Sequence, residues 1–162
     1  MTVMKYAALL LLASAALAQA PAATLAVTGD VPMPLTLTLA NLAAMPRQTV
    51  RIPNPDGSMA VYEGVALIDV LKKAGVPFGG ELRGKALASY VLAKASDGYQ
   101  VVFTPGEIDP SFGSQTMLIA DHRDGAPLSG NLGSLRLVVA NDKEGARSVR
   151  MLEALEFVRL RK

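Results

Sequence analysis

Asp97 and Tyr99 place a carboxylate and an aromatic ring two residues apart, at the expected tip of a hairpin. A carboxylate can accept two parallel N–H donors from the edge of a flat heterocycle, and an aromatic ring can stack on its face. The pair therefore predicts a binding site for a flat polar ligand. The alternative is an ordinary Ser-Asp-Gly turn followed by a half-buried tyrosine.

A second group of polar residues, Asp121 to Asp124, follows an expected strand over 117–120 and precedes a glycine turn. These side chains could converge on a ligand, which makes Asp121 and Arg123 candidate binding residues; the alternative is a solvated hairpin loop. His122, the single histidine, stands beside Asp121 as in a general-base pair, but adjacent residues of a chain rarely point together. No serine or cysteine has a recognisable setting for nucleophilic attack, so no catalytic residue is predicted.

The third group is basic. Lys143, Arg147 and Arg150 surround Gly145 at spacings of three and four residues, which would put the three cations on one face of a helix. Arginine makes bidentate contacts with phosphate, so the group predicts contact with an anionic ligand, and Arg147 is expected to serve binding rather than stability. The alternatives are contacts with ring oxygens of an uncharged ligand, an acidic partner surface, or a solvated basic face.

Short alternating or apolar runs bounded by glycine and proline predict the elements that position these groups. Helices are expected over 39–45 and 66–74, and Thr104 to Glu107 has the residue order of a capping box that opens a third. This pattern predicts an α+β fold with a mixed, mostly antiparallel sheet and two or three short helices. The expected strands are 25–28, 35–39, 47–52, 59–62, 87–93, 99–103, 117–120, 135–140 and 152–158.

The first 18 residues are expected to be a signal peptide. Lys5 gives a positive start, the apolar stretch Tyr6–Leu17 is shorter than the about 20 residues of a membrane span, and small residues allow cleavage after Ala18. Residues 19–23 then form a linker and residues 24–162 a single domain. After cleavage, the chain is expected to be soluble, not membrane-spanning, and periplasmic or secreted.

Composition excludes several partners and chemistries. Removal of the lysine in the signal peptide from the 16 basic residues leaves 15 against 14 acidic ones. Such a balance gives no reason to expect nucleic acid as a partner. The chain has no cysteine, so it lacks both the disulfides that an exported protein can form and the residue that a lipid anchor would need.

Three segments of the chain, in order and spacing, resemble one known domain family. They are similar to the helix entry, the central hairpin and the C-terminal strand pair of the sulfite-oxidase-type molybdopterin-binding domain. The resemblance spans roughly residues 24–158 and implies that residues 143–150 belong to the part that meets the phosphate of the cofactor. The segments are Tyr62–Leu71, Ser96–Tyr99, and Asp124–Leu128 with Leu135–Val139, and the run Gly125–Leu152 as a whole looks like the closing segment of that domain.

Enzymes of this family hold molybdenum through a cysteine thiolate, a soft ligand that no other residue type in this chain replaces. In the family that cysteine follows the strand matching residues 47–52. Here the loop Pro53–Met59 has none, and the Ser58 hydroxyl is too hard a ligand. The resemblance therefore implies recognition of the organic part of the cofactor. No metal-binding residue is predicted, and molybdenum redox catalysis is not expected.

Small exported members of this fold resemble periplasmic pterin-binding proteins that report to a membrane signalling protein. The first hypothesis is accordingly a non-catalytic sensor that binds a tetrahydropterin-like pterin, or molybdopterin without protein-ligated molybdenum, and signals to a membrane partner. One alternative is a subunit of a molybdopterin-dependent oxidoreductase, in which a partner supplies the metal ligand. The other is a ligand-free interaction domain whose pocket has collapsed, and an open cleft between residues 96–99 and 143–150 would argue against it.

Overall fold

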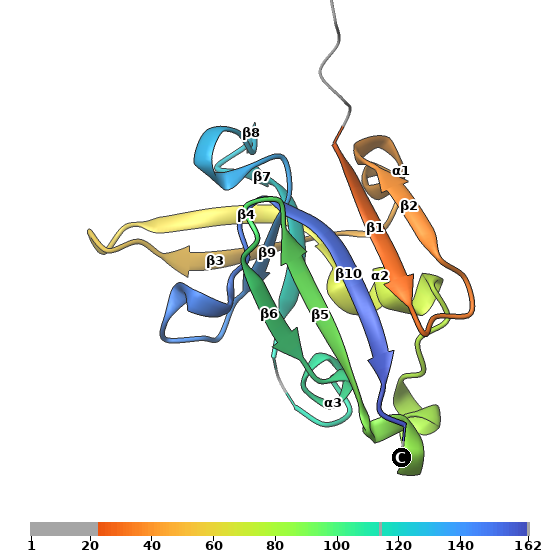
Figure 1. The fold of residues 1–162 in the computed structure, drawn as a ribbon. Coiled ribbons are helices and arrows are strands. Elements are labelled where there is room, and N and C mark those ends of the chain that lie inside the picture. The colour runs from red at the N-terminus through yellow and green to blue at the C-terminus, as the bar shows by residue number, and fades with distance from the viewer. Residues whose placement is uncertain (1–22, 114, 162) are drawn as a thin grey trace, which may run out of the picture.

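The structure, a computed structural model, describes residues 23–113 and 115–161 (Figure 1). The expected signal peptide, residues 1–18, and residues 19–22 of the expected linker lie outside the described residues. Among the helices that are described, none has the length and apolar character needed to cross a membrane.

The first of two sheets joins strands from both ends of the described chain. It consists of β1 (Thr24–Gly29), β2 (Leu35–Thr38), β5 (Ser89–Ala95), β6 (Gln100–Phe103) and β10 (Leu152–Arg159). Its spatial order is β2–β1–β10–β5–β6, and its neighbours are antiparallel except β1 and β10, which run parallel. Figure 1 shows the blue β10 between the orange β1 and the green β5.

The second sheet is antiparallel throughout. It consists of β3 (Arg47–Pro53), β4 (Met59–Ala66), β7 (Met117–Arg123), β8 (Ala126–Pro127) and β9 (Arg136–Val139). β7 pairs with β4 along one edge, and along the other edge with β9 and then β8. The β7–β9 pair therefore brings the start of β9 close to the polar end of β7.

Three short α-helices and four 3₁₀ helices complete the described part of the chain. The predicted capping box is present, because Thr104 and Glu107 exchange side-chain-to-backbone hydrogen bonds. The expected α+β class, with a mostly antiparallel arrangement and short helices, is confirmed. The helices are α1 (Leu39–Ala43), α2 (Leu67–Lys73), α3 (Pro105–Ile108) and the 3₁₀ helices Gly79–Glu81, Gly84–Leu87, Gly130–Leu132 and Gly145–Arg147.

The main hydrophobic core contains side chains from both sheets and α2. Leu67, Val70 and Leu71 are fully buried at helical spacing on one face of α2. A smaller apolar cluster in the second sheet includes Leu118 and Tyr62, whose side chains belong to that cluster and not to the main core. Tyr62 is thereby held in a fixed position from which its hydroxyl can bind other side chains.

Asp109, a buried carboxylate, ties α3 to the 3₁₀ helix at Gly79. It accepts the N–H of Gly79 at 2.5 Å and the N–H of Ser111 at 2.8 Å. Burial alone would raise the pKa of Asp109, but these donors and the charge of Lys72 outweigh it and hold the pKa below its ordinary value. The carboxylate therefore stays charged at neutral pH and stabilises this junction.

Asp109→Asn is expected to lower the free energy of unfolding at pH 7 by about 1–3 kcal/mol, because the amide cannot satisfy two buried N–H donors as the carboxylate does. The folded-state pKa is depressed, so this stabilisation is present above the unfolded pKa of about 3.9 and is lost as the pH falls through the folded value. Urea unfolding from pH 7 to pH 2 measures it, with the exposed Glu81→Gln as control. A difference between wild type and Asp109→Asn that stayed constant with pH would contradict the prediction.

Candidate ligand-binding site

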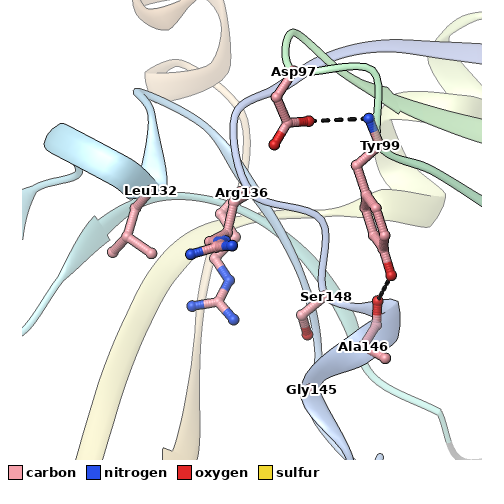
Figure 2. Close-up of a pocket in the computed structure, with 8 residues that line it drawn as sticks. Asp97, Tyr99, Leu132, Arg136, Gly145, Ala146 and Ser148 are labelled. Atoms are coloured by element: carbon pink, nitrogen blue, oxygen red, sulfur yellow. Dashed lines mark hydrogen bonds between the residues drawn. The ribbon is translucent and has the colours of Figure 1, made fainter.

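An open cavity of about 390 Å³ lies between the β5–β6 hairpin and the segment that follows β9 (Figure 2). We call it the arginine cavity. It lies between residues 96–99 and 143–150. An open cleft at this position argues against the hypothesis of a collapsed pocket. Its walls carry polar and charged side chains, and its lining residues are Asp97, Tyr99, Leu132, Arg136, Gly145, Ala146, Ser148 and Arg150.

The β5–β6 hairpin brings both residues predicted at its tip to the cavity. Gly98 takes a φ of 88°, which glycine adopts without strain, and the Asp97 carboxylate closes the turn by accepting the Tyr99 N–H at 3.0 Å. The Tyr99 hydroxyl donates to the Ala146 carbonyl on the opposite wall at 2.6 Å, as Figure 2 shows. Tyr99 thus joins the two walls, a role that the sequence alone did not predict.

Arg136, the first residue of β9, has no carboxylate partner among the described residues. Its Nη1 donates to the Tyr62 hydroxyl at 2.6 Å, and its guanidinium carbon lies 5.1 Å from the centre of the Tyr62 ring. Its buried Nε has no hydrogen-bond partner in that part of the chain. Burial, together with the nearby charges of Arg123 and Arg150, lowers the pKa of Arg136. Such a guanidinium gains from a neighbouring anion, so the cavity suits a phosphate or carboxylate group.

Two further polar residues of the opposite wall complete the arginine cavity. Arg150, an exposed residue, brings a second guanidinium to it. The Ser148 hydroxyl accepts the N–H of Val139 at 3.0 Å, which fixes this wall against β9 and leaves the hydroxyl proton for another acceptor. Asp97 is the one acidic residue in the lining, so arginine charge exceeds carboxylate charge there.

The structure contradicts the expectation that Lys143, Arg147 and Arg150 share one helical face. Only Gly145–Arg147 is helical, as a single 3₁₀ turn, and Ser148 is already extended. Neither Lys143 nor Arg147 lines the arginine cavity. Glycine at the start of this turn and the return of the chain toward β10 prevent a longer helix.

Arg147 instead has its charge paired with two carboxylates. Its Nε donates to Asp142 at 2.7 Å and its Nη1 to Glu107 at 3.1 Å, while its guanidinium carbon lies 5.5 Å from the centre of the Phe103 ring. The two carboxylates raise the pKa of Arg147, with the hydrogen bond to Asp142 as the largest cause. Arg147 therefore ties the 142–147 segment to the start of α3.

The polar run Asp121–Asp124 does not converge on one ligand. Asp121 to Arg123 continue β7 rather than forming a loop. The register with β4 shifts here, so Asp121 is an extra residue, and this bulge lets neighbouring side chains point together. His122 Nδ1 lies 2.7 Å from the Asp121 carboxylate, contrary to the expectation for adjacent residues. Arg123 instead donates to Asn54 and lies over the Tyr62 ring.

Asp121 is a buried structural carboxylate. Arg47 donates to its two oxygens at 2.8 and 2.5 Å and also to Glu63. Burial alone would raise the pKa of Asp121, but the hydrogen bonds from Arg47 and His122 hold it below its ordinary value. Asp121 does not line the arginine cavity, and Arg123 reaches it only indirectly, through the Tyr62 ring that both Arg123 and Arg136 contact.

Comparison with known proteins identifies the family. Residues 54–162 match the family described as the oxidoreductase molybdopterin binding domain. The chain belongs to this family. A solved structure with the same fold is the sulfane dehydrogenase SoxCD from Paracoccus pantotrophus, with a TM-score of 0.64 and 20% sequence identity. The likeness covers 84% of this chain and 38% of that chain, and it shows the fold alone. No curated protein sequence matches the chain.

Membership of the molybdopterin-binding domain family implies a molybdopterin-type cofactor, and the residues present fit its organic part better than its metal. The guanidinium groups of Arg136 and Arg150, neither of which has a carboxylate partner among the described residues, suit the anionic end of such a group. For the metal, the chain has no cysteine. Ser58 is occupied, since it donates to Asp56 and accepts from Asn54 within its turn. The described residues also include no cluster of His, Asp or Glu able to hold a metal ion.

Sequence reasoning missed Arg136, the central residue of this molybdopterin-binding domain's cavity. Its signal was present: it is the one charged residue within the apolar run Leu135–Ala140. A charge inside a strand that is otherwise buried needs a partner or a function. Leu132, Gly145, Ala146 and Ser148 gave no comparable signal.

Arg147→Gln is expected to lower stability, whereas Arg136→Gln is not. Arg147→Gln removes a paired, partly exposed cation and should lower the free energy of unfolding by about 1 kcal/mol, or Tm by roughly 3 °C. Arg136→Gln should not lower stability, because relief of repulsion from two arginines offsets the lost bond to Tyr62. Thermal unfolding by circular dichroism measures both.

Lys143→Gln is the matched control, since this exposed lysine has no ion pair among the described residues and should leave Tm unchanged. A larger loss of stability in Arg136→Gln than in Arg147→Gln would reverse the assignment of the two arginines.

Proposed function

We propose that this chain is a periplasmic, non-catalytic pterin-binding protein that senses a pterin and signals to a membrane partner. The single observation that carries the proposal is the arginine cavity, where the half-buried guanidinium of Arg136, which has no carboxylate partner in the described part of the chain, lines an open space of about 390 Å³. A site that keeps an unpaired cation gains stability when an anionic ligand arrives. The family match supports a ligand of the molybdopterin type.

The ligand is a pterin that carries an anionic substituent. Arg136 and Arg150 bind the anion, preferably a phosphate, because two guanidinium groups offer several parallel donors. A simple tetrahydropterin lacks such a group, so molybdopterin without protein-ligated molybdenum, or a phosphorylated reduced pterin, fits better. Asp97 and Tyr99 remain candidates for polar contacts beside the anion.

The proposed signalling uses the position of the site between two segments. The β5–β6 hairpin and the 145–150 segment form opposite walls and are joined by the hydrogen bond between Tyr99 and Ala146. A ligand that contacts both walls stabilises the arrangement in which the walls are close. A partner protein with higher affinity for this arrangement would then bind the ligand-loaded chain more tightly than the empty chain. Export to the periplasm rests on the N-terminal segment, and the membrane partner on the resemblance to pterin-binding sensors.

A binding measurement tests the proposal. The purified chain, prepared from the cell envelope, is expected to contain a fluorescent pterin detectable by mass spectrometry. After its removal, the chain should bind 6-(hydroxymethyl)pterin phosphate in a fluorescence titration. Arg136→Gln and Arg150→Gln should each weaken binding by about tenfold, because each removes a charged hydrogen-bond donor.

Lys143→Gln is the control for nonspecific loss of positive charge and should bind as wild type does. Higher salt should weaken wild-type binding more than binding by Arg136→Gln. Protein that is empty on purification and that fails to bind the phosphorylated pterin would overturn the proposed function.

The second candidate function is a subunit of a molybdopterin-dependent oxidoreductase, favoured by the family to which the chain belongs. Because the chain offers no cysteine, a partner would have to supply the metal ligand. Elemental analysis of the complex isolated from the envelope distinguishes the two: one molybdenum per chain favours the oxidoreductase, and metal-free, pterin-loaded protein favours the sensor. A ligand-free interaction domain is less favoured, because the cavity is open and charged.

A further inference from the structure

A second cavity, larger than the first at about 720 Å³, borders the arginine cavity. It lies between the N-terminal half of β1, the start of β10 and the segment that leads into β9. We call it the glycine cavity, because Gly130 and Gly133 line it together with small side chains such as Ala26 and Ala154. Leu135, Met151 and Leu152 add larger apolar side chains to the lining, so a ring can lie against apolar surface there.

Three segments line both cavities, each contributing neighbouring residues to the two sides. Ser96, Gly133 and Met151 line the glycine cavity. Asp97, Leu132 and Arg150, the residues next to them in the chain, line the arginine cavity. The segments are tied to one another, since the Ser96 N–H donates to Met151 at 3.0 Å and the Met151 N–H to Leu132 at 2.9 Å. The cavities therefore share a rim.

The geometry of this rim depends on Met151 and Gly133. Met151 is a non-glycine residue with a φ of 51°, in the left-handed region. A Cβ placed on Gly133 would lie 2.7 Å from the Met151 Cα, so only glycine permits this contact. The backbone at this rim is consequently tightly packed, and Gly133 adds no side chain to it.

Glu153 is the one charged residue in the glycine cavity. The register between β10 and β5 shifts at Glu153, between Leu152 and Ala154, so this residue sits in a β-bulge. Bulges redirect side chains next to binding sites. Glu153 is exposed and has no hydrogen-bond or ion-pair partner among the described residues, so its carboxylate is available to a ligand.

We propose that the glycine cavity binds the pterin ring and that Glu153 is the residue that selects it. The 2-amino group and N3 of a pterin form two parallel N–H donors, which a carboxylate accepts as it accepts a guanidinium. The phosphate then lies on Arg136 and Arg150, and the ligand crosses the shared rim. This assignment rests on the proposed function and adds the residue that distinguishes a pterin from other flat rings.

Glu153 suits this role better than Asp97. One oxygen of Asp97 already accepts the Tyr99 N–H. Asp97 also lies in the same cavity as Arg136 and Arg150, where a carboxylate is attracted to the guanidinium groups. Glu153 lies in a cavity that no other charged residue lines and that has several apolar lining residues.

The test compares two rings that differ at the recognised edge. Lumazine has a carbonyl in place of the 2-amino group of a pterin, so a carboxylate that accepts two donors should bind it less well. The purified chain is titrated with 6-(hydroxymethyl)pterin phosphate and with 6-(hydroxymethyl)lumazine phosphate. Wild type is expected to prefer the pterin by about tenfold or more, and Glu153→Gln to lose that preference while binding lumazine as before.

Controls separate this inference from the proposed function. Glu81→Gln makes the same charge change at an exposed site outside both cavities and should keep the preference. If wild type binds the pterin phosphate but Glu153→Gln keeps its preference, or if Asp97→Asn loses it instead, Glu153 is not the selecting residue and the proposed function stands. If wild type binds neither compound, both the inference and the proposed function fail.

Discussion

Backbone hydrogen bonds through Met151 hold together the three segments from which the binding site is built. The β5–β6 hairpin and β10 belong to the first sheet, while the segment before β9 leads into the second. Met151 accepts from Ser96 and donates to Leu132, so one residue connects all three. Its left-handed backbone and its close approach to Gly133 leave little freedom at this point. The positions of both cavities depend on this junction.

Arg136 differs from two other arginines of the fold in how its charge is balanced. Arg47 and Arg147 each bind two carboxylates, and these pairs fix strands and loops. Arg136 contacts the ring and hydroxyl of Tyr62 but, within residues 23–113 and 115–161, no carboxylate, and two further arginines lie near it. The arginines of the cavity differ from Arg47 and Arg147 in this respect, and a ligand with a negative charge would neutralise them.

Local sequence signals predicted the elements well. The capping box at Thr104, the hairpin at Asp97 and the helix over 66–74 depend on residues close together in the chain, so their patterns are visible in the sequence. The family resemblance was also confirmed, since it rests on the order of several such segments.

The partners of the polar residues were not predictable in the same way, because they come from distant segments. Arg147 resembled a phosphate ligand until the structure placed Glu107, 40 residues away, beside it. The Asp121–His122 contact depends on a bulge set by the register with β4. Arg136 is held in place by a hydrogen bond to Tyr62, which lies 74 residues earlier in the chain. Contacts of this kind are set by the sheet topology, which no local pattern specifies.

The bond between Tyr99 and Ala146 has a consequence for how quickly the site exchanges its ligand. It is one hydrogen bond between exposed groups, of the kind worth about 1 kcal/mol, so breaking it changes the balance between joined and separated walls by only about fivefold. This bond by itself therefore adds little delay to the departure of a ligand. The residence time of a ligand is set by the strength of its own contacts. When the ligand concentration changes, the occupied fraction of sites therefore adjusts quickly to the new concentration.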